Sequence, residues 1–154
     1  METSQAITQS FTSILHEWVG VFMRRSMHEF VQFSKDSGLT ISQLSALFRL
    51  YHGGTCGVSE IGDHLGVTNA AASQMVERLV QLGLLERSED RSDRRVKNLT
   101  LTENGRRMVI ESITARQAWM EQLTITLTSE QQASISAALL ALTEAAQRLE
   151  KPDR

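Results

Sequence analysis

The sequence predicts a mainly α-helical protein with one small β-hairpin. Over most of the 154 residues, apolar side chains recur every three or four positions, which is the period of an amphipathic helix. Threonines that can cap a helix N-terminus stand at the start of several of these stretches. Two short segments, residues 84–87 and 96–101, flank the charged hexapeptide DRSDRR, an order typical of two strands and their connecting loop.

The composition excludes several classes of protein. The chain is 41% hydrophobic and 22% charged, which is ordinary for a globular domain. Its longest unbroken apolar run covers only residues 137–142, far fewer than the roughly 20 residues of a membrane-spanning helix. The first residues lack the pattern of a signal peptide, and the single cysteine, Cys56, cannot form an intrachain disulfide. We therefore expect a cytoplasmic protein that does not contact a membrane.

The first predicted helix covers residues 11–33. Its apolar side chains are spaced by four, three and four positions, which places them on one helix face. These are Phe11, Leu15, Trp18 and Phe22. The sequence Asp-Ser-Gly at residues 36–38 is expected to end the helix.

The second predicted helix begins after Thr40. Thr40 and Gln43 have the spacing of a capping box, in which each side chain bonds a backbone N–H at the helix start. Two glycines at residues 53–54 end the helix, because glycine readily adopts the left-handed conformation found there. The apolar stripe of this helix is Leu44, Leu47, Phe48 and Tyr51. Residues 56–58 are expected to form a brief strand.

Two further helices are predicted over residues 59–65 and 69–82, separated by a tight turn. Gly66 breaks the first and Thr68 is a favourable N-cap for the second. Ile61, Leu65 and Val67 are expected to face the core. In the second helix, the spacing of the apolar positions directs three residues inward: Ala72, Val76 and Leu79.

The hairpin precedes two long helices. Thr102 is expected to cap a helix over residues 103–123, and Thr128 with Gln131 forms another capping box before a helix over residues 129–150. The apolar residues of the last helix are spaced by four, three, four and three positions, which is typical of one helix packing along another. They are Ile135, Leu139, Leu142, Ala146 and Leu149.

The order of helix, short strand, helix, tight turn, helix and hairpin is that of a winged helix-turn-helix. In this arrangement the second helix of the pair can lie in the DNA major groove, and the hairpin can reach the backbone or minor groove beside it. Asparagine and glutamine can pair with adenine, and small residues let the helix approach the bases closely. The outward residues of the predicted recognition helix are Asn69, Ala70, Ala71, Ser73, Gln74 and Arg78.

The hairpin loop concentrates positive charge in a chain whose net charge is −2. Such a local basic tip can contact nucleic acid. Its cations are Arg91, Arg94, Arg95 and Lys97. We expect Asp90 and Asp93 to pair with the arginines and hold the shape of the loop. The alternative is a solvated loop whose charges pair only with one another.

Residues 40–105 resemble the winged helix-turn-helix of the MarR family of bacterial transcription regulators. The motifs that carry the resemblance are GVSEI at 57–61, GVTNAAAS at 66–73, GLLER at 83–87 and DRSDRRVKNLTLTENG at 90–105. The resemblance implies that Arg94 or Arg95 enters the minor groove. Many family members have arginine in place of Gln74 and proline in place of Arg91. The further DNA contacts that the resemblance implies are Thr68, Asn69, Ala70, Ala71, Ser73 and Gln74.

The winged helix-turn-helix needs only residues 40–102 of the single domain expected over 1–154. The helices predicted within 5–35 and 103–150 have apolar stripes that must be buried, and we expect them to act as dimerisation helices. A two-fold dimer would place two recognition helices about one turn of DNA apart. These features predict a homodimer on double-stranded DNA, bound at a pseudo-palindromic operator.

The resemblance also implies a repressor that a small aromatic or lipophilic effector releases from the operator. The candidate residues of its pocket are Trp18, Phe22 and Phe48. The aromatic and methionine residues expected to be core, some of them also lining this pocket, are Trp18, Phe22, Met23, Phe30 and Phe48.

A protein-interaction module that does not bind DNA is the alternative, because the chain is nearly neutral and lacks arginine at Gln74. An enzyme is not expected, since the sequence has no glycine-rich phosphate loop and no G-x-S-x-G motif. The four histidines include no close pair of metal ligands, so neither a metal nor a cofactor is expected. Cys56 could be a redox sensor, but a small buried residue is the simpler interpretation.

Overall fold

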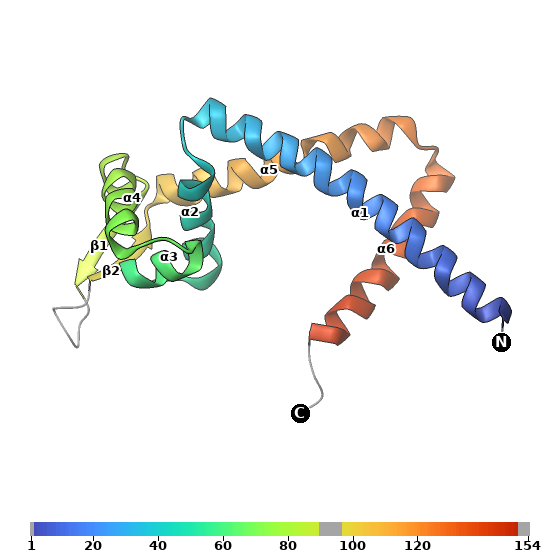
Figure 1. Cartoon of the computed structure of the whole chain (residues 1–154). Coiled ribbons are helices and arrows are strands. Elements are labelled where there is room, and N and C mark those ends of the chain that lie inside the picture. The colour runs from blue at the N-terminus through green and yellow to red at the C-terminus, as the bar shows by residue number, and fades with distance from the viewer. Residues whose placement is uncertain (1, 90–96, 151–154) are drawn as a thin grey trace. The chain divides into compact units, whose positions relative to one another are not determined.

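The computed structural model describes the backbone of residues 2–89 and 97–150 and the side chains of residues 10–88 and 98–149. These residues form helices and one two-stranded antiparallel sheet, as predicted (Figure 1). The chain forms two compact units, Met1–Arg116 and Gln117–Arg154. The elements are α1 (Glu2–Ser37), α2 (Ile41–Gly53), α3 (Val58–Leu65), α4 (Asn69–Gln81), β1 (Leu85–Glu89), β2 (Lys97–Leu101), α5 (Glu103–Thr126) and α6 (Ser129–Glu150).

Helix α1 begins nine residues before the start that the sequence predicted, at Glu2 rather than Phe11. The prediction followed the apolar stripe, and residues 2–10 are mostly polar and so do not extend it. No proline or glycine lies in this stretch, so nothing in it opposes the helix. The helix ends before Gly38, whose φ of +69° is a left-handed conformation that favours glycine.

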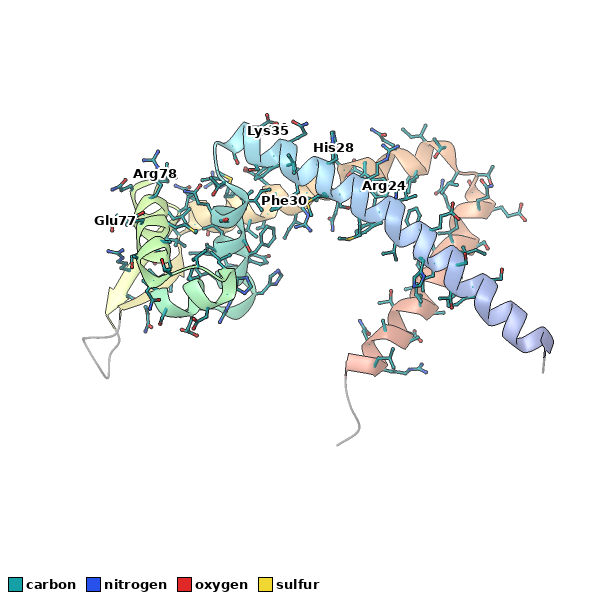
Figure 2. All side chains as sticks on the ribbon, viewed as in Figure 1. Arg24, His28, Phe30, Lys35, Glu77 and Arg78 are labelled. Carbon is teal, nitrogen blue, oxygen red and sulfur yellow. The ribbon has the colours of Figure 1, made fainter. Side chains whose placement is uncertain are left out.

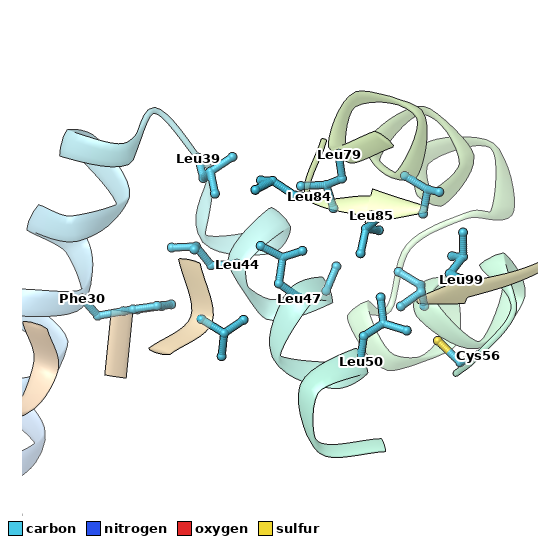
Figure 3. Packing of buried hydrophobic residues seen from close by; sticks show 14 residues of the cluster. Phe30, Leu39, Leu44, Leu47, Leu50, Cys56, Leu79, Leu84, Leu85 and Leu99 are labelled. Carbon is cyan, nitrogen blue, oxygen red and sulfur yellow. The ribbon is translucent and has the colours of Figure 1, made fainter. Parts of the chain in front are cut away.

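Helices α2, α3 and α4 pack with the hairpin around one apolar core (Figure 3). Ala72, Val76 and Leu79 are fully buried, which confirms the predicted inward face of α4. Val67 was predicted to face the core, but 37% of it is exposed. Its backbone N–H bonds the carbonyl of Gly62 at 3.0 Å in the turn that ends α3, so the backbone serves the turn while the side chain lies at the surface. The fully buried side chains from the other elements include Leu44, Leu47, Ile61 and Leu99.

The hairpin pairs β1 with β2, with Leu85 opposite Leu101 and Glu89 opposite Lys97. Cys56 adds an isolated bridge to Leu99, whose backbone N–H donates to the Cys56 carbonyl at 2.8 Å. The brief strand expected at residues 56–58 is therefore reduced to Cys56, because Val58 already belongs to α3.

The start of α5 is fixed to the hairpin through Thr102. Its hydroxyl accepts a hydrogen bond from the backbone N–H of Gly105 at 3.0 Å and donates one to the carbonyl of Gly83 at 2.6 Å. Its own backbone N–H bonds the carbonyl of Leu84 at 3.1 Å. Gly105 lies directly over that carbonyl, and a Cβ at this position would collide with it. These contacts explain why a threonine and a glycine stand three residues apart at this helix start.

In the second unit, the turn between α5 and α6 is held by polar side chains. Thr128 and Gln131 form the predicted capping box, with bonds of 2.9 and 3.3 Å. The side-chain amide of Gln132 donates to the carbonyls of Thr124 and Leu127, both at 2.9 Å. The apolar stripe of α6 stays largely exposed, including 44% of Leu139.

No helix in the described part of the chain is long and apolar enough to cross a membrane.

Candidate nucleic-acid interface

Helix α4 presents a small, uncharged surface at its first two turns. Thr68 caps the helix, and its hydroxyl accepts a hydrogen bond from the backbone N–H of Ala71 at 3.3 Å. With the core residues directed inward, the side chains that were predicted to contact DNA are all exposed. They are Thr68, Asn69, Ala70, Ala71, Ser73, Gln74 and Arg78. The structure therefore brings this predicted set together on one face, where small side chains would let the backbone approach the bases.

Helix α3 holds the start of α4 at close range. Gly62 is buried, and a Cβ there would lie 3.2 Å from the carbonyl oxygen of Val67 and 3.4 Å from the Oδ1 atom of Asn69. Gly66, with a φ of +65°, supplies the left-handed turn between the two helices. The absence of a side chain at Gly62 thus permits the tight approach that positions Asn69.

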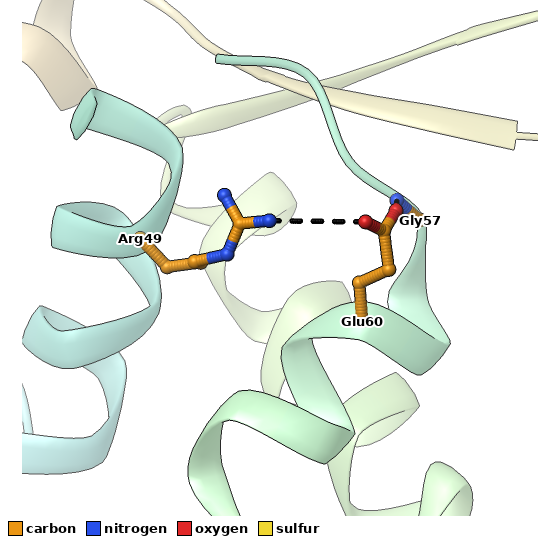
Figure 4. A network of polar contacts seen from close by, with 3 residues as sticks. All are labelled: Arg49, Gly57 and Glu60. Carbon is orange, nitrogen blue, oxygen red and sulfur yellow. Dashed lines mark hydrogen bonds and ion pairs between the residues drawn. The ribbon is translucent and has the colours of Figure 1, made fainter. Parts of the chain in front are cut away.

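Glu60 anchors α3 to its surroundings. Its carboxylate accepts a hydrogen bond from the backbone N–H of Gly57 at 2.7 Å, which caps the helix, and lies 3.7 Å from the guanidinium of Arg49 on α2 (Figure 4). This pair was not among the interactions predicted from the sequence. Glu60 stands three residues after Gly57, the spacing of a capping box, but glycine has no side chain to complete the motif.

After its neutral first turns, α4 carries charged side chains, one of which connects this helix to the hairpin. Glu77 and Arg78 are exposed on α4 (Figure 2). The carboxylate of Glu77 lies 3.0 Å from the guanidinium of Arg87 on β1. This ion pair is not predictable from the sequence either, because the two residues belong to different elements and no spacing rule joins them. On the other face of the hairpin, the Thr100 hydroxyl donates to the Glu86 carboxylate at 3.2 Å.

Most of the predicted wing residues lie outside the described part of the structure. Strands β1 and β2 lead to residues 90–96, and Lys97 begins β2 with a side chain that is not described. Their roles in DNA contact and loop shape stay predictions. The residues concerned are Asp90, Arg91, Asp93, Arg94, Arg95 and Lys97.

Phe48, one of the three predicted pocket residues, lies in an aromatic cluster. Its ring makes an edge contact with Phe30 on α1 and stacks on His52, with centroids 6.2 Å apart in both cases. The guanidinium of Arg116 on α5 lies 4.9 Å from the ring centre of Phe30 and 5.6 Å from that of Phe48, within the range of cation–π attraction.

A surface hollow opens beside this cluster. It is lined by Phe48, Arg49, His52, Gly53 and His64. Trp18 and Phe22, the other two predicted pocket residues, do not line it. They lie two to three helical turns before Phe30 on α1, so the structure does not bring the three residues into this one hollow.

Cys56 is suited to packing rather than to redox chemistry. Its side chain is only 2% exposed, and burial raises the pKa of its thiol above the ordinary value of 9.0. A thiol with a raised pKa stays protonated near neutral pH and is a poor nucleophile. Within the described ranges, no three histidine, cysteine, aspartate or glutamate side chains are close enough together to hold a metal ion.

Comparison with known proteins gives a consistent result. The model of the MarR family matches residues 39–97. The chain is 32% identical over 123 residues to the HTH-type transcriptional repressor MdtR of Bacillus subtilis, a match that covers 80% of this chain and 79% of that protein.

Solved structures agree with the sequence comparison. The transcriptional regulator Tm0710 from Thermotoga maritima is 28% identical with a TM-score of 0.80, covering 94% of this chain and 99% of its own. BpsR from Bordetella bronchiseptica, whose DNA binding is regulated by 6-hydroxynicotinic acid, is 26% identical with a TM-score of 0.52, covering 83% of this chain and 91% of its own.

Proposed function

The chain belongs to the MarR family of DNA-binding transcriptional regulators, and we propose that it is a homodimeric repressor, not an enzyme, that a small-molecule effector releases from its operator. The observation that carries this proposal is the neutral, exposed face of α4 beside a hairpin that leads to a basic tip. Small polar side chains on a helix suit base reading in the major groove, and arginines suit the backbone or minor groove.

The proposed contacts divide into two kinds. Asn69 and Gln74 read base edges, and the exposed small residues around them allow close approach. Arg78 and the wing cations, Arg94 or Arg95 foremost, bind the backbone or the minor groove. This division predicts that changes to the two sets have different consequences for binding.

We propose that the winged helix-turn-helix of residues 40–102 is held on DNA by dimerisation through the helices within 5–35 and 103–150. Support comes from the large apolar side chains of these stripes that one chain leaves exposed, including 57% of Phe11 and 87% of Leu149. Packing of these stripes against a second copy would remove the exposed apolar surface of both chains from water. A two-fold pair of recognition helices would then reach half-sites about 34–36 Å apart.

We propose a small aromatic or lipophilic effector, because the related BpsR responds to an aromatic acid. Phe48 and the hollow beside it are the candidate contacts. Trp18 and Phe22 on α1 do not line this hollow, so an effector that they contact would bind at a separate place on α1. MdtR is named a repressor, which favours the same sign of regulation here.

Selection of bound DNA from random sequence pools, followed by gel shifts at a fixed salt concentration, tests the proposal. We expect a pseudo-palindromic site bound by the dimer. Asn69→Ala or Gln74→Ala should change which bases are preferred, whereas Arg94→Ala with Arg95→Ala should weaken binding to many sequences and flatten its salt dependence. A chain that selects no sequence and shifts no DNA would instead be a protein-interaction module, and the proposal would be wrong.

A further inference from the structure

We propose that the ion pair between Glu77 and Arg87 fixes the wing to the recognition helix and thereby positions the wing arginines on DNA. The two side chains are positioning residues that need not touch DNA themselves. The inference rests on the proposed DNA contacts of the wing, and the experiments below separate the failure of one from the failure of the other.

The hairpin places Arg87 on its inward face. Arg87 lies opposite Leu99 in the strand register and two residues after Leu85, and both leucines are buried. Since alternate residues of a strand point to the same side, Arg87 continues this buried row beyond the edge of the core. It is the last inward-facing residue of β1 whose side chain the structure describes before the tip at residues 90–96.

Helix α4 supplies the other half of the pair. Glu77 follows Ser73 by four residues and Gln74 by three, spacings that place it one turn further along the same side of the helix. Its carboxylate lies 3.0 Å from the Arg87 guanidinium. The pair therefore joins the helix proposed to read bases to the strand that carries the wing.

The charge of Glu77 means that the ion pair can affect DNA binding as well as stability. A carboxylate beside DNA repels phosphates, so an unpaired glutamate at this position would oppose binding. The pair is also half-exposed, with 51% of the Glu77 side chain and 35% of the Arg87 side chain accessible, and ion pairs this exposed stabilise a fold little. Its contribution is the direction in which the wing leaves the core.

Glu77→Gln tests the proposal through the sign of its effect. Removal of a negative charge near DNA should by itself tighten binding. A loss of wing position should instead weaken operator binding about 3- to 10-fold, as expected for coupled neighbouring residues. The salt dependence of binding should also flatten toward that of the Arg94→Ala, Arg95→Ala variant. A misplaced wing makes fewer phosphate contacts, so binding releases fewer counterions. The melting temperature should change little.

Glu86→Gln is the matched control. Glu86 lies on the opposite face of the same strand, and glutamine there can still accept the hydrogen bond from Thr100. It removes the same charge from the same hairpin and should leave binding unchanged or slightly tighter. Reversal of the pair, Glu77→Arg with Arg87→Glu, should bind more tightly than either single reversal. Tighter or unchanged binding by Glu77→Gln would overturn the proposal.

A combined variant separates this inference from the proposed function. In the Arg94→Ala, Arg95→Ala background, Glu77→Gln should no longer weaken binding, because the principal wing contacts that the pair positions are gone and only the removal of a negative charge remains. If the additional Glu77→Gln change weakens binding as much as it does in the wild type, the pair acts independently of the wing and the inference is wrong. If Arg94→Ala with Arg95→Ala binds like the wild type, the proposed wing contact itself fails.

Discussion

The winged helix-turn-helix and the helices that flank it differ in where their apolar side chains lie. In α2, α3, α4 and the hairpin, the large apolar residues that face the core are almost fully buried within one chain. In α1 and α6, residues of the same type remain exposed, such as 64% of Ile14 and 66% of Leu140. The first region therefore obtains its stability from its own core, whereas the apolar surface of the second remains available to another chain.

Leu47→Ala should give the largest loss of unfolding free energy among the changes that test this difference. Leu47 is fully buried on α2 at the centre of the core, and a leucine-to-alanine change at such a site costs about 3 kcal/mol of unfolding free energy. Chemical denaturation at a fixed protein concentration measures the loss. Leu140→Ala, the same change at a site of α6 that is 66% exposed within one chain and lies outside its apolar stripe, should cost far less. Equal losses at the two sites would contradict the difference between the regions.

Gly105→Ala should cost about 2 kcal/mol, in the range of overpacking a tight contact. The new methyl group would collide with the Leu84 carbonyl, so the start of α5 must move away from the hairpin. The measurement is the same denaturation experiment. Gly20→Ala within α1 is the control, because its nearest neighbour is the flexible end of Arg24 at 3.4 Å. A stable Gly105→Ala protein would show that this approach is not needed.

Leu139→Ala tests the exposed apolar face of α6 through its effect on dimer formation. Its effect on the single chain should be small, since 44% of Leu139 is exposed. If α6 pairs with a second copy, the change should weaken the dimer by about 1 kcal/mol per chain through lost apolar burial. Sedimentation equilibrium measures the dissociation constant. Glu144→Ala, on the opposite side of α6, should leave it unchanged, and an equal effect of both variants would argue against this interface.

The winged helix-turn-helix was predictable because its signals are local. Thr40 and Gln43 form the expected capping box, with bonds of 2.8 and 3.2 Å, and the spacing of apolar residues gave the inward face of α4 correctly. Contacts between elements were not predictable in the same way. Neither periodicity nor capping joins Glu77 to Arg87, and Val67 has an apolar side chain although the turn leaves it exposed.

The start of α1 shows a related limit of the sequence signal. An apolar stripe marks the face of a helix that can pack against another element, not the residue at which the helix begins. Residues 2–10 lack the stripe and still belong to α1. The flanking helices are therefore the region where sequence patterns are least informative about the single chain. Residues that the sequence predicted as core remain partly exposed there, including 38% of Trp18 and 52% of Met23.

The smallest expected effect is that of Cys56 on the pH dependence of stability. It tests whether water is excluded from the core of the winged helix-turn-helix. Burial raises the pKa of its thiol, so the native state keeps the proton to a higher pH than the unfolded chain does. As pH rises through the ordinary value of 9.0, the unfolded chain loses this proton first, which favours unfolding. The stabilising contribution is thus complete below pH 9.0 and declines above it. Denaturation of the wild type and Cys56→Ala between pH 7 and 10 isolates the thiol from other titrating groups. The variant should lose less stability with rising pH, and parallel curves would mean that Cys56 is not held in a closed core.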